Sequence, residues 1–341
     1  MSIQLKTGPW LLNDIKSVTK NELKVFSCFH CAGGSTMGYK LAGFDVIGGV
    51  EIDPQMMQIY KTNHHPKRSY LMGVQEFNKI PNDQLPQELF ELDILDGSPP
   101  CSSFSMAGSR EKAWGKNKKF REGQAHQVLD DLFFDFIETA NKLKPKVVVA
   151  ENVKGLISGN AKGYVKQIFQ KFNESGYSVQ LFLLNASAMG VPQRRERIFF
   201  IANRLGKKIK LHFSETQISV EQAWFGLPKQ TSTPLTDFTL NLWKKVKPGQ
   251  SMVKVNNGNG FNNHRLPFKT PSMTIASSGG LYHPIEPRNL SDLEFLRLQT
   301  FPDNYFFGSK GARYFCGMSV PPYMMQRVAN QIAIQFFDKN K

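Results

Sequence analysis

The chain has 341 residues, 40% of them hydrophobic, and a formal net charge of +15. This length allows one large domain or two unequal ones, and without a long apolar run we expect no membrane span. The N-terminus shows no secretory signal and cysteine occurs only four times, so we expect a cytoplasmic protein with reduced thiols. The basic excess indicates a polyanionic partner, most often nucleic acid; a lysine-rich soluble surface is the alternative.

The first part of the chain alternates strand-like and helix-like segments. Strands are predicted over residues 24–29, 45–53, 92–98, 146–153 and 194–204, and helices over 35–43, 54–64, 124–143 and 163–177. Pro54 opens the second helix, and 146–153 is continuously apolar, as expected of a strand buried on both faces. This alternation predicts an α/β fold with a doubly wound parallel sheet, in which ligands bind beyond the carboxyl ends of the strands.

Beyond Arg204 the alternation stops. Residues 206–270 carry ten Lys or Arg residues against three acidic ones, and include a loop-like NNGNGFNN stretch at 256–263. This composition predicts a smaller, irregular and basic second domain. The last helix is expected over 326–337, with apolar positions that suit docking back on the sheet.

A glycine-containing turn follows the first strand. Gly33 and Gly34 allow positive φ and a close approach of the backbone to a ligand. Glu51 ends the second strand, where an acid commonly binds adjacent ribose hydroxyls, and Asp53 competes for that role. The dinucleotide pattern G-x-G-x-x-G is absent, so a nucleoside without phosphates fits better, and S-adenosylmethionine is the obvious one. The alternative is a plain tight turn.

Cys28 and Cys31 form a C-x-x-C pair beside this turn. A zinc site would need a second close pair, and a thioredoxin-like site would open a helix with the pair rather than place it in a strand. We therefore expect ordinary buried thiols and no metal site.

Cys101 follows the third predicted strand in a stiff loop. In Pro99-Pro100-Cys101 the prolines fix φ and exclude helix, so the loop holds the thiol in one place. Glu151 lies near the end of the 146–153 strand, where poor solvation should raise its pKa and let it hold a proton.

Gln193, Arg195 and Arg197 alternate along the last predicted strand and therefore share one face. Two arginines beside a thiol lower its pKa and orient a polar substrate. A thiolate, a protonatable carboxylate, guanidinium groups and S-adenosylmethionine together suit methylation of carbon 5 of cytosine. Thiolate addition to carbon 6 and protonation of ring nitrogen 3 make carbon 5 enamine-like, so that it attacks the sulfonium methyl group. Each motif alone is more often a turn, a cap or a solvated charged stretch, and their joint order carries the prediction.

These motifs in this order resemble the DNA (cytosine-C5) methyltransferase family of bacterial restriction-modification type, over almost the whole chain. The matching stretches are Phe29-His30-Cys31-Ala32-Gly33-Gly34, Glu51, Pro99-Pro100-Cys101 with Phe104-Ser105, Glu151-Asn152-Val153, Gln193 with Arg195 and Arg197, PRNLSDLEFLRLQTFPDNY (287–305) and GMSVPP (317–322). The resemblance implies a Rossmann-like, S-adenosylmethionine-binding catalytic domain over residues 1–203 plus 314–341. It also implies a smaller, irregular target recognition domain over 204–313, and a target base flipped out of the duplex.

The chain departs from the family pattern at three places. Cys31 stands at the first glycine of the opening motif, which narrows the room beside the cofactor. Gly73-Val74-Gln75 stands where the family usually has Gly-Asp-Ile, whose acid bonds the adenine amino group, and we expect Gln75 or Glu76 to take over that contact. Met318 stands at the asparagine of the final motif.

The motifs and the resemblance together define the expected site. The catalytic residues are Cys101, Glu151, Arg195 and Arg197. S-adenosyl-L-methionine, which leaves as S-adenosyl-L-homocysteine, is expected to be bound by Phe29, Ala32, Gly33, Gly34, Glu51, Ile52, Val74, Gln75, Ser98, Pro100, Leu132, Ser319 and Val320. DNA contacts, with lysines on phosphates and asparagines on bases, are expected from Ser102, Ser105, Lys116, Lys118, Lys119, Arg121, Gln193, Asn256, Asn257, Asn259 and Arg265.

We expect a monomer of bacterial or phage origin that acts on double-stranded DNA. A cognate restriction endonuclease would be linked to it functionally and not physically. Two alternatives stay open. An RNA (tRNA) cytosine-C5 methyltransferase would use the same chemistry, although the sizeable basic insert favours duplex DNA. A non-catalytic DNA-binding relative would keep the fold and lose methyl transfer.

Overall fold

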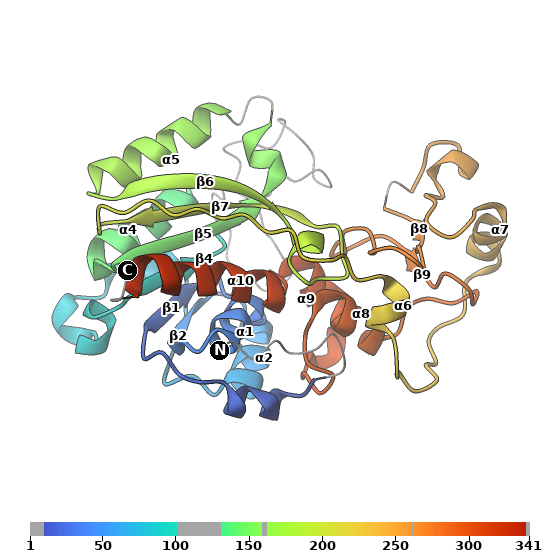
Figure 1. Ribbon diagram of the computed structural model, residues 1–341, viewed down its shortest axis with the longest axis horizontal. Coiled ribbons are helices and arrows are strands. Elements are labelled where there is room, and N and C mark those ends of the chain that lie inside the picture. The colour runs from blue at the N-terminus through green and yellow to red at the C-terminus, as the bar shows by residue number, and fades with distance from the viewer. Residues whose placement is uncertain (1–9, 101–130, 159–161, 261, 339–341) are drawn as a thin grey trace. The chain divides into compact units, whose positions relative to one another are not determined.

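Figure 1 shows a computed structural model of the chain, which describes residues 10–100, 131–158, 162–260 and 262–338. The chain divides into two compact units. The sheet unit comprises Thr19–Leu184, Glu196–His212 and Gln326–Lys341, and the second unit comprises Met1–Val18, Asn185–Arg195 and Phe213–Met325. Each unit therefore consists of three chain segments, whereas we predicted one domain of two segments (1–203 and 314–341) and one continuous domain (204–313). Among the described residues, no helix combines the length and apolarity needed to cross a membrane.

The sheet unit is built on a seven-stranded sheet with the order β3-β2-β1-β4-β5-β7-β6. Its strands are β1 (Lys24–Cys28), β2 (Asp45–Glu51), β3 (Arg68–Leu71), β4 (Ile94–Gly97), β5 (Val147–Val153), β6 (Ser178–Asn185) and β7 (Glu196–Asn203). Strands β1 to β5 pair in parallel, as predicted, whereas β7 runs antiparallel to β5. The prediction of an all-parallel sheet is wrong at β7, because the β6–β7 connection over residues 186–195 contains no crossover α-helix, which parallel neighbours require.

Helices alternate with the parallel strands. In the first part of the chain they are α1 (Gly34–Leu41), α2 (Pro54–His64), α3 (Val74–Lys79), α4 (Leu132–Leu143) and α5 (Lys162–Glu174). The second unit contains α6 (Val220–Ala223), α7 (Asp237–Lys245), α8 (Asp292–Gln299), α9 (Ala312–Met318) and a short parallel pair, β8 (His264–Arg265) with β9 (Leu281–Tyr282). The last helix, α10 (Pro322–Ile332), continues as a π-helix over Ala333–Phe337.

The predicted elements are present, with ends shifted by a few residues. The part of the predicted 124–143 helix that precedes residue 131 lies outside the described residues. The sequence-based prediction lacks β3, α3 and β6. The first of these is a four-residue edge strand without a buried side chain, so it carries no hydrophobic periodicity.

One face of the sheet carries the main hydrophobic core. Alternate residues of a strand point to the same face, so Phe26, Val148 and Phe200 meet the apolar sides of α3, α4 and α5. Burial of each side chain of this size contributes roughly 2 kcal/mol. At the end of β4, a Cβ on Gly97 would lie 2.4 Å from the ring of Phe136, so the glycine makes room for α4. The core therefore fixes the first turns of α4 above the carboxyl end of β4.

A buried carboxylate organises the opposite face. Asp96 of β4 is 2% exposed and accepts hydrogen bonds from Ser27 Oγ of β1 and Ser35 Oγ of α1, each at 2.7 Å. Tyr39 OH of α1 donates to the other carboxylate oxygen at 3.4 Å. Burial raises the pKa of Asp96 to about 6, and the three hydroxyl donors oppose that rise. This Asp96 network joins two central strands to the helix that follows β1.

The C-terminal segment docks on the sheet unit, as predicted from its apolar positions. Gln326 Nε2 donates to the carbonyl of Leu41, at the end of α1, at 3.1 Å. Gln335 binds both the amide and the carbonyl of Lys210, each at 2.9 Å. The Gln335 side chain thus satisfies the backbone N–H and C=O of Lys210, as the backbone of a neighbouring strand would.

We predict that Asp96→Asn changes the pH dependence of folding stability. The pKa of Asp96, about 6, lies above the usual 3.8. Stability linked to the protonated carboxyl is therefore present below about pH 4 and is lost as the pH rises through about 6. Between pH 4 and pH 7 the wild type should lose roughly 2 kcal/mol of unfolding free energy relative to the variant. Urea unfolding at both pH values measures this loss.

Asp83→Asn, at an exposed position of the same unit, is the matched control and should follow the wild type. A stability difference between wild type and Asp96→Asn that stays constant from pH 4 to pH 7 would rule out this ionisation.

Candidate active site

The order of the strands reverses at β1, which has β2 and β3 on one side and β4 and β5 on the other. Ligands of open α/β sheets bind beyond the carboxyl ends of the strands at such a point. Cys28, the last residue of β1, pairs with Gly97, the last residue of β4. Residues 29–33, which we call the cradle turn, and the loop 98–100 therefore leave the sheet side by side.

The cradle turn is tightly wound. Phe29, Cys31 and Gly33 have φ angles of 54°, 51° and 90°, which glycine adopts freely and the other two adopt with strain. A Cβ on Gly33 would lie 2.2 Å from His64 Nε2, so a histidine of α2 fills the space that the glycine leaves. The thiol of Cys31 lies 3.4 Å from Met56 Sδ of α2. The cysteine that replaces the family's glycine is thus packed against α2.

Glu51, the last residue of β2, is held in place by the cradle turn. Its Oε2 accepts a hydrogen bond from Cys31 N and its Oε1 accepts one from Asp53 N, both at 2.9 Å. The Asp53 carboxylate instead caps α2 through Gln55 N and Met56 N. Because a carboxylate oxygen accepts more than one hydrogen bond, Glu51 suits a pair of ribose hydroxyls better than Asp53 does.

The other expected cofactor residues of the sheet unit differ in what they expose. Ala32 and Gly34 are buried in the cradle turn and the start of α1, and Val74 and Leu132 are 2% and 1% exposed. Half-buried surface remains at Phe29, Ile52, Gln75, Ser98 and Pro100.

Gln75 and Glu76, the two residues expected to contact adenine, lie at the start of α3. Glu76 Oε2 accepts a hydrogen bond from Gly73 N at 3.2 Å and so closes a capping box. Gln75 Nε2 donates to Asp135 Oδ2 of α4 at 2.7 Å. The Glu76 carboxylate is therefore bonded to the backbone of its own helix. Gln75, by contrast, binds the Asp135 carboxylate and so places a second acid beside the start of α3.

The loop that leads to Cys101 is tied to the neighbouring strand. Asn152 of β5 is 4% exposed, and its Nδ2 donates to the carbonyl of Pro99 at 3.1 Å. The same side chain accepts a hydrogen bond from Val153 N at 2.8 Å, which fixes the orientation of the amide. Cys101 itself lies outside the described residues, as do the expected DNA contacts Ser102, Ser105, Lys116, Lys118, Lys119 and Arg121.

Glu151 and Arg197, two of the predicted catalytic residues, are in contact. Arg197 Nε lies 3.0 Å from Glu151 Oε1, and the two side chains are 13% and 11% exposed. Arg197 Nη1 also donates to the carbonyl of Glu196 at 2.8 Å. Burial lowers the pKa of Arg197, and the nearby carboxylate opposes that shift. The antiparallel pairing of β5 with β7 thus brings the Glu151 carboxylate and the Arg197 guanidinium together where little solvent reaches them.

Gln193 lies in the second unit and is fully buried. Its Oε1 accepts a hydrogen bond from Ile275 N at 2.9 Å, and its Nε2 donates to Gln299 Oε1 at 2.6 Å and to Leu298 O at 3.3 Å. Its position does not support the predicted DNA contact, because the amide is used inside the protein.

Arg195 is likewise buried in the second unit, at 1% exposure. Its Nη1 donates to Ile275 O at 2.9 Å, and its Nη2 donates to Gly317 O at 2.8 Å and to Ser319 O at 3.0 Å. The predicted alternation therefore does not place the two arginines in the same surroundings, because Arg197 pairs with Glu151 whereas Arg195 donates to backbone carbonyls. These bonds hold the segment that contains Ser319.

Ser319 and Val320, expected to bind the cofactor, are 4% and 3% exposed. The Oγ of Ser319 is buried and has no hydrogen-bond partner among the described residues. A buried hydroxyl of this kind suits a polar ligand atom. Within the sheet unit itself, the Glu51 carboxylate fixed by two backbone amides is the observation that fits S-adenosylmethionine.

The expected base-reading residues of the second unit fall into two groups. Asn257 and Asn259 are exposed on a loop, and Asn256 is half-buried beside them. Arg265 is occupied within the fold, since it donates to backbone carbonyls and lies 3.6 Å from the centre of the Trp243 ring. This stacking gives Arg265 a structural role and leaves the asparagines as the accessible candidates.

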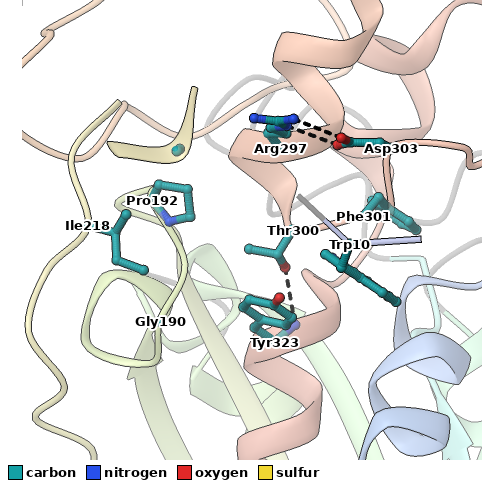
Figure 2. A pocket seen from close by; sticks show the side chains of 10 residues that line it. Trp10, Gly190, Pro192, Ile218, Arg297, Thr300, Phe301, Asp303 and Tyr323 are labelled. Atoms are coloured by element: carbon teal, nitrogen blue, oxygen red, sulfur yellow. Dashed lines mark hydrogen bonds and ion pairs between the residues drawn. The ribbon is translucent and has the colours of Figure 1, made fainter. Parts of the chain in front are cut away.

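Figure 2 shows a cavity within the second unit, lined by Trp10, Gly190, Pro192, Ile218, Ala223, Arg297, Thr300, Phe301, Asp303 and Tyr323. Arg297 pairs with Asp303 through bonds of 2.9 and 2.8 Å, and Tyr323 N donates to Thr300 Oγ1 at 3.1 Å. Its volume of about 40 Å³ has room for water but not for a nucleoside. This cavity is therefore not the cofactor site.

Sequence reasoning missed Asp96 and Asp135 and assigned no role to Asn152. For Asp96 a signal exists, because an acid inside the apolar LDILDG segment must find donors when the strand is buried. For Asp135 there is none, because its partner Gln75 is 60 positions away in the chain.

The strand order, the switch-point turn and the acid at the end of β2 define an S-adenosylmethionine-dependent methyltransferase fold. A model of the C-5 cytosine-specific DNA methylase family matches residues 23–333, and the chain belongs to that family.

Several relatives are Type II methyltransferases. M.Sau96I of Staphylococcus aureus is 30% identical over 94% of this chain and 78% of its own length. M.FnuDI of Fusobacterium nucleatum is 27% identical over 94% of this chain and 96% of its own. The orphan methyltransferase M.SPRI of Bacillus phage SPR is 33% identical over 54% of this chain and 38% of its own. The family and these relatives make the chain a DNA (cytosine-5-)-methyltransferase.

Solved structures share the fold. A candidate DNA modification methyltransferase encoded in an Escherichia coli prophage has a TM-score of 0.69 and 22% identity, covering 92% of this chain and 99% of its own. The Dnmt2 methyltransferase of S. pombe has a TM-score of 0.57 and 16% identity, covering 93% and 100%. At these identities the likeness establishes the fold alone.

We predict that Asn152→Ala loosens the loop that carries Cys101. The variant leaves the Pro99 carbonyl without its donor, which should cost about 1–3 kcal/mol of stability. Because Cys101 is the expected nucleophile, its misplacement should lower kcat about 10- to 100-fold while the KM for S-adenosylmethionine changes little. Steady-state methylation of genomic DNA and urea unfolding measure the two effects.

Asn173→Ala, at an exposed position of α5, is the control and should change neither quantity. A destabilised Asn152→Ala protein with an unchanged kcat would show that the bond supports the fold and not the nucleophile.

Proposed function

We propose that the protein transfers a methyl group from S-adenosylmethionine to carbon 5 of a cytosine within a specific duplex DNA sequence, through an extruded base and a covalent Cys101 adduct. The family supports DNA cytosine methylation. The observation that supports this mechanism is the arrangement on β5: Asn152 bonds Pro99 two residues before Cys101, and the adjacent Glu151 pairs with Arg197.

In this proposal the chain's own residues activate the base. The Cys101 thiolate forms a bond to carbon 6 of cytosine, and Glu151 holds a proton at ring nitrogen 3, so that carbon 5 becomes enamine-like. Arg197 keeps the Glu151 carboxyl group in a fixed direction. After methylation, loss of the carbon 5 proton returns the electron pair that expels the thiolate, and the cysteine is regenerated.

The cradle turn and Glu51 would hold the methyl donor in the sheet unit, with Ile52 beside them. When bound, S-adenosylmethionine supplies an electrophilic methyl group on its sulfonium, which the activated carbon 5 accepts. Glu51 would bind the ribose hydroxyls, because both of its oxygens are already oriented by backbone amides.

The charge and the second unit favour duplex DNA as the partner. The net charge of +15 suits a phosphate backbone, and Asn257 and Asn259 are exposed polar groups of the type that reads base edges. Because carbon 5 reacts above and below the ring, the base must leave the stack. We propose that the protein acts as a monomer, and that a cognate restriction endonuclease would be linked to it functionally and not physically.

We predict that Cys101→Ser abolishes methyl transfer while DNA binding persists. With S-adenosylmethionine and duplex DNA that contains 5-fluorocytosine at the target, the wild type should form a covalent protein–DNA adduct, because fluorine blocks loss of the substituent on carbon 5. The variant should form none, and its transfer of tritiated methyl groups should fall below a few per cent of wild type. Denaturing gels and scintillation counting measure the two results.

Cys316→Ser, which changes a buried thiol of α9 by the same atom, is the control and should keep adduct formation. Tritium in tRNA but not in DNA would overturn the choice of substrate. Tritium in neither would favour a non-catalytic DNA-binding protein.

A further inference from the structure

Helices α3 and α4 are held together by polar contacts that do not involve the Asp135 carboxylate. Asn78 Nδ2 donates to the backbone carbonyl of Asp135 at 2.9 Å, and Thr139 Oγ1 donates to Asn78 Oδ1 at 2.8 Å. These bonds and the α3–α4 packing place the backbone of Asp135. Its side chain is therefore available for another purpose.

The Asp135 carboxylate has an incomplete set of partners. In the described part of the chain its one hydrogen-bond donor is Gln75 Nε2, at 2.7 Å from Oδ2. The charged groups that act on it are Asp131 and Glu138, both acidic. Burial is the main effect that raises the pKa of Asp135, and the Gln75 bond opposes it. Within the described residues this half-buried carboxylate has no cation beside it and one oxygen without a donor, an arrangement that suits a donor supplied by a ligand.

Gln75 lies next to the expected ribose-binding end of the site. A Cβ on Gly73 would lie 3.4 Å from Gln75 Oε1 and 3.8 Å from Ile52 Cδ1. Ile52 directly follows Glu51, whose carbonyl accepts a hydrogen bond from Met72 N at 3.2 Å. Gln75 Oε1 and Ile52 Cδ1 therefore both lie close to Gly73, and Ile52 is the residue that follows Glu51.

The helix that carries Asp135 also borders the cradle turn. Phe136, the next residue, packs over Gly97, and its ring centre lies 6.4 Å from that of Phe29. Phe29 is the first residue of the cradle turn. The first turns of α4 thus contact the cradle turn through Phe136 and the start of α3 through the Asp135–Gln75 bond.

We infer that Asp135, positioned by Gln75, accepts a hydrogen bond from the exocyclic amino group of the adenine of the bound methyl donor. This inference depends on the proposed binding of S-adenosylmethionine at Glu51. An amino group on a purine donates, and a carboxylate accepts. Val74 belongs to the hydrophobic core and offers no polar side-chain atom, and Glu76 is engaged in its capping box. The acid that binds the purine amino group is therefore Asp135 of α4, and the carboxamide of Gln75 on α3 orients it.

The test compares two ligands that differ in the group at position 6 of the base and in the hydrogen that ring nitrogen 1 carries in the 6-oxo form. Binding of S-adenosylhomocysteine, which carries a 6-amino group, and S-inosylhomocysteine, which carries a 6-oxo group, is measured by calorimetry on the full-length protein without DNA. The wild type should prefer the amino ligand by about 100-fold, because the oxo group faces a carboxylate.

Asp135→Asn should bind S-adenosylhomocysteine about 10- to 100-fold more weakly. Its discrimination should disappear or reverse, because the new amide keeps an oxygen toward Gln75 Nε2 and turns its NH₂ toward the 6-oxo group. Gln75→Ala should reduce the discrimination without reversing it, as expected when a positioning residue is lost. A purely structural role for either residue would weaken both ligands equally.

Asp131→Asn, an exposed acid at the start of the same helix, is the matched control and should keep the wild-type preference. Thermal unfolding without ligand shows whether each variant is folded. If the wild type binds S-adenosylhomocysteine and Asp135→Asn keeps the full preference for it, this inference fails and the proposed function stands. If the wild type binds neither ligand, the proposed function fails, and the inference fails with it.

Discussion

The buried carboxylate of Asp96 is the interaction on which the rest of the site depends. It accepts hydrogen bonds from β1 and from α1 while it is itself part of β4. The cradle turn lies between β1 and α1, and the Pro-Pro-Cys loop follows β4 directly. A single acid in the core therefore fixes the start of the cradle turn, its end, and the start of the loop that leads to Cys101. Its burial is unfavourable for the charged form, and three hydroxyl donors make it tolerable.

Polar residues of the recognised motifs divide into those for which we propose a chemical role and those that hold the chain together. Glu151 and Arg197 pair near the end of β5, and Asn152 beside them binds the loop that leads to Cys101. Gln193 and Arg195, only a few positions earlier than Arg197, form hydrogen bonds inside the second unit, mainly with backbone groups and, for Gln193, also with the side chain of Gln299. Buried amide and guanidinium groups must find partners, so these two residues specify which segments of that unit meet.

Much of the fold could be predicted from the sequence, because strand and helix periodicities are strong in the first part of the chain. The edge strand β3 was out of reach because none of its side chains is buried, and the inverted β7 because direction depends on a connection rather than on composition. The motifs correctly indicated Glu51, Glu151 and Arg197 as polar groups at strand ends. They could not distinguish Arg197 from Arg195, since a shared strand face does not say which carbonyls lie nearby. Asp135 was invisible because its significance arises from contact with a distant residue.

The contact between Gly33 and His64 links two positions that lie on different elements. The His64 imidazole occupies the volume that a side chain at position 33 would need. A larger residue therefore does not fit at position 33 as long as His64 is present. Among descendants of this sequence, substitutions at the two positions should appear together, with a smaller residue at 64 accompanying any side chain gained at 33. A designer who wishes to reshape the cradle turn would have to begin with His64 on α2.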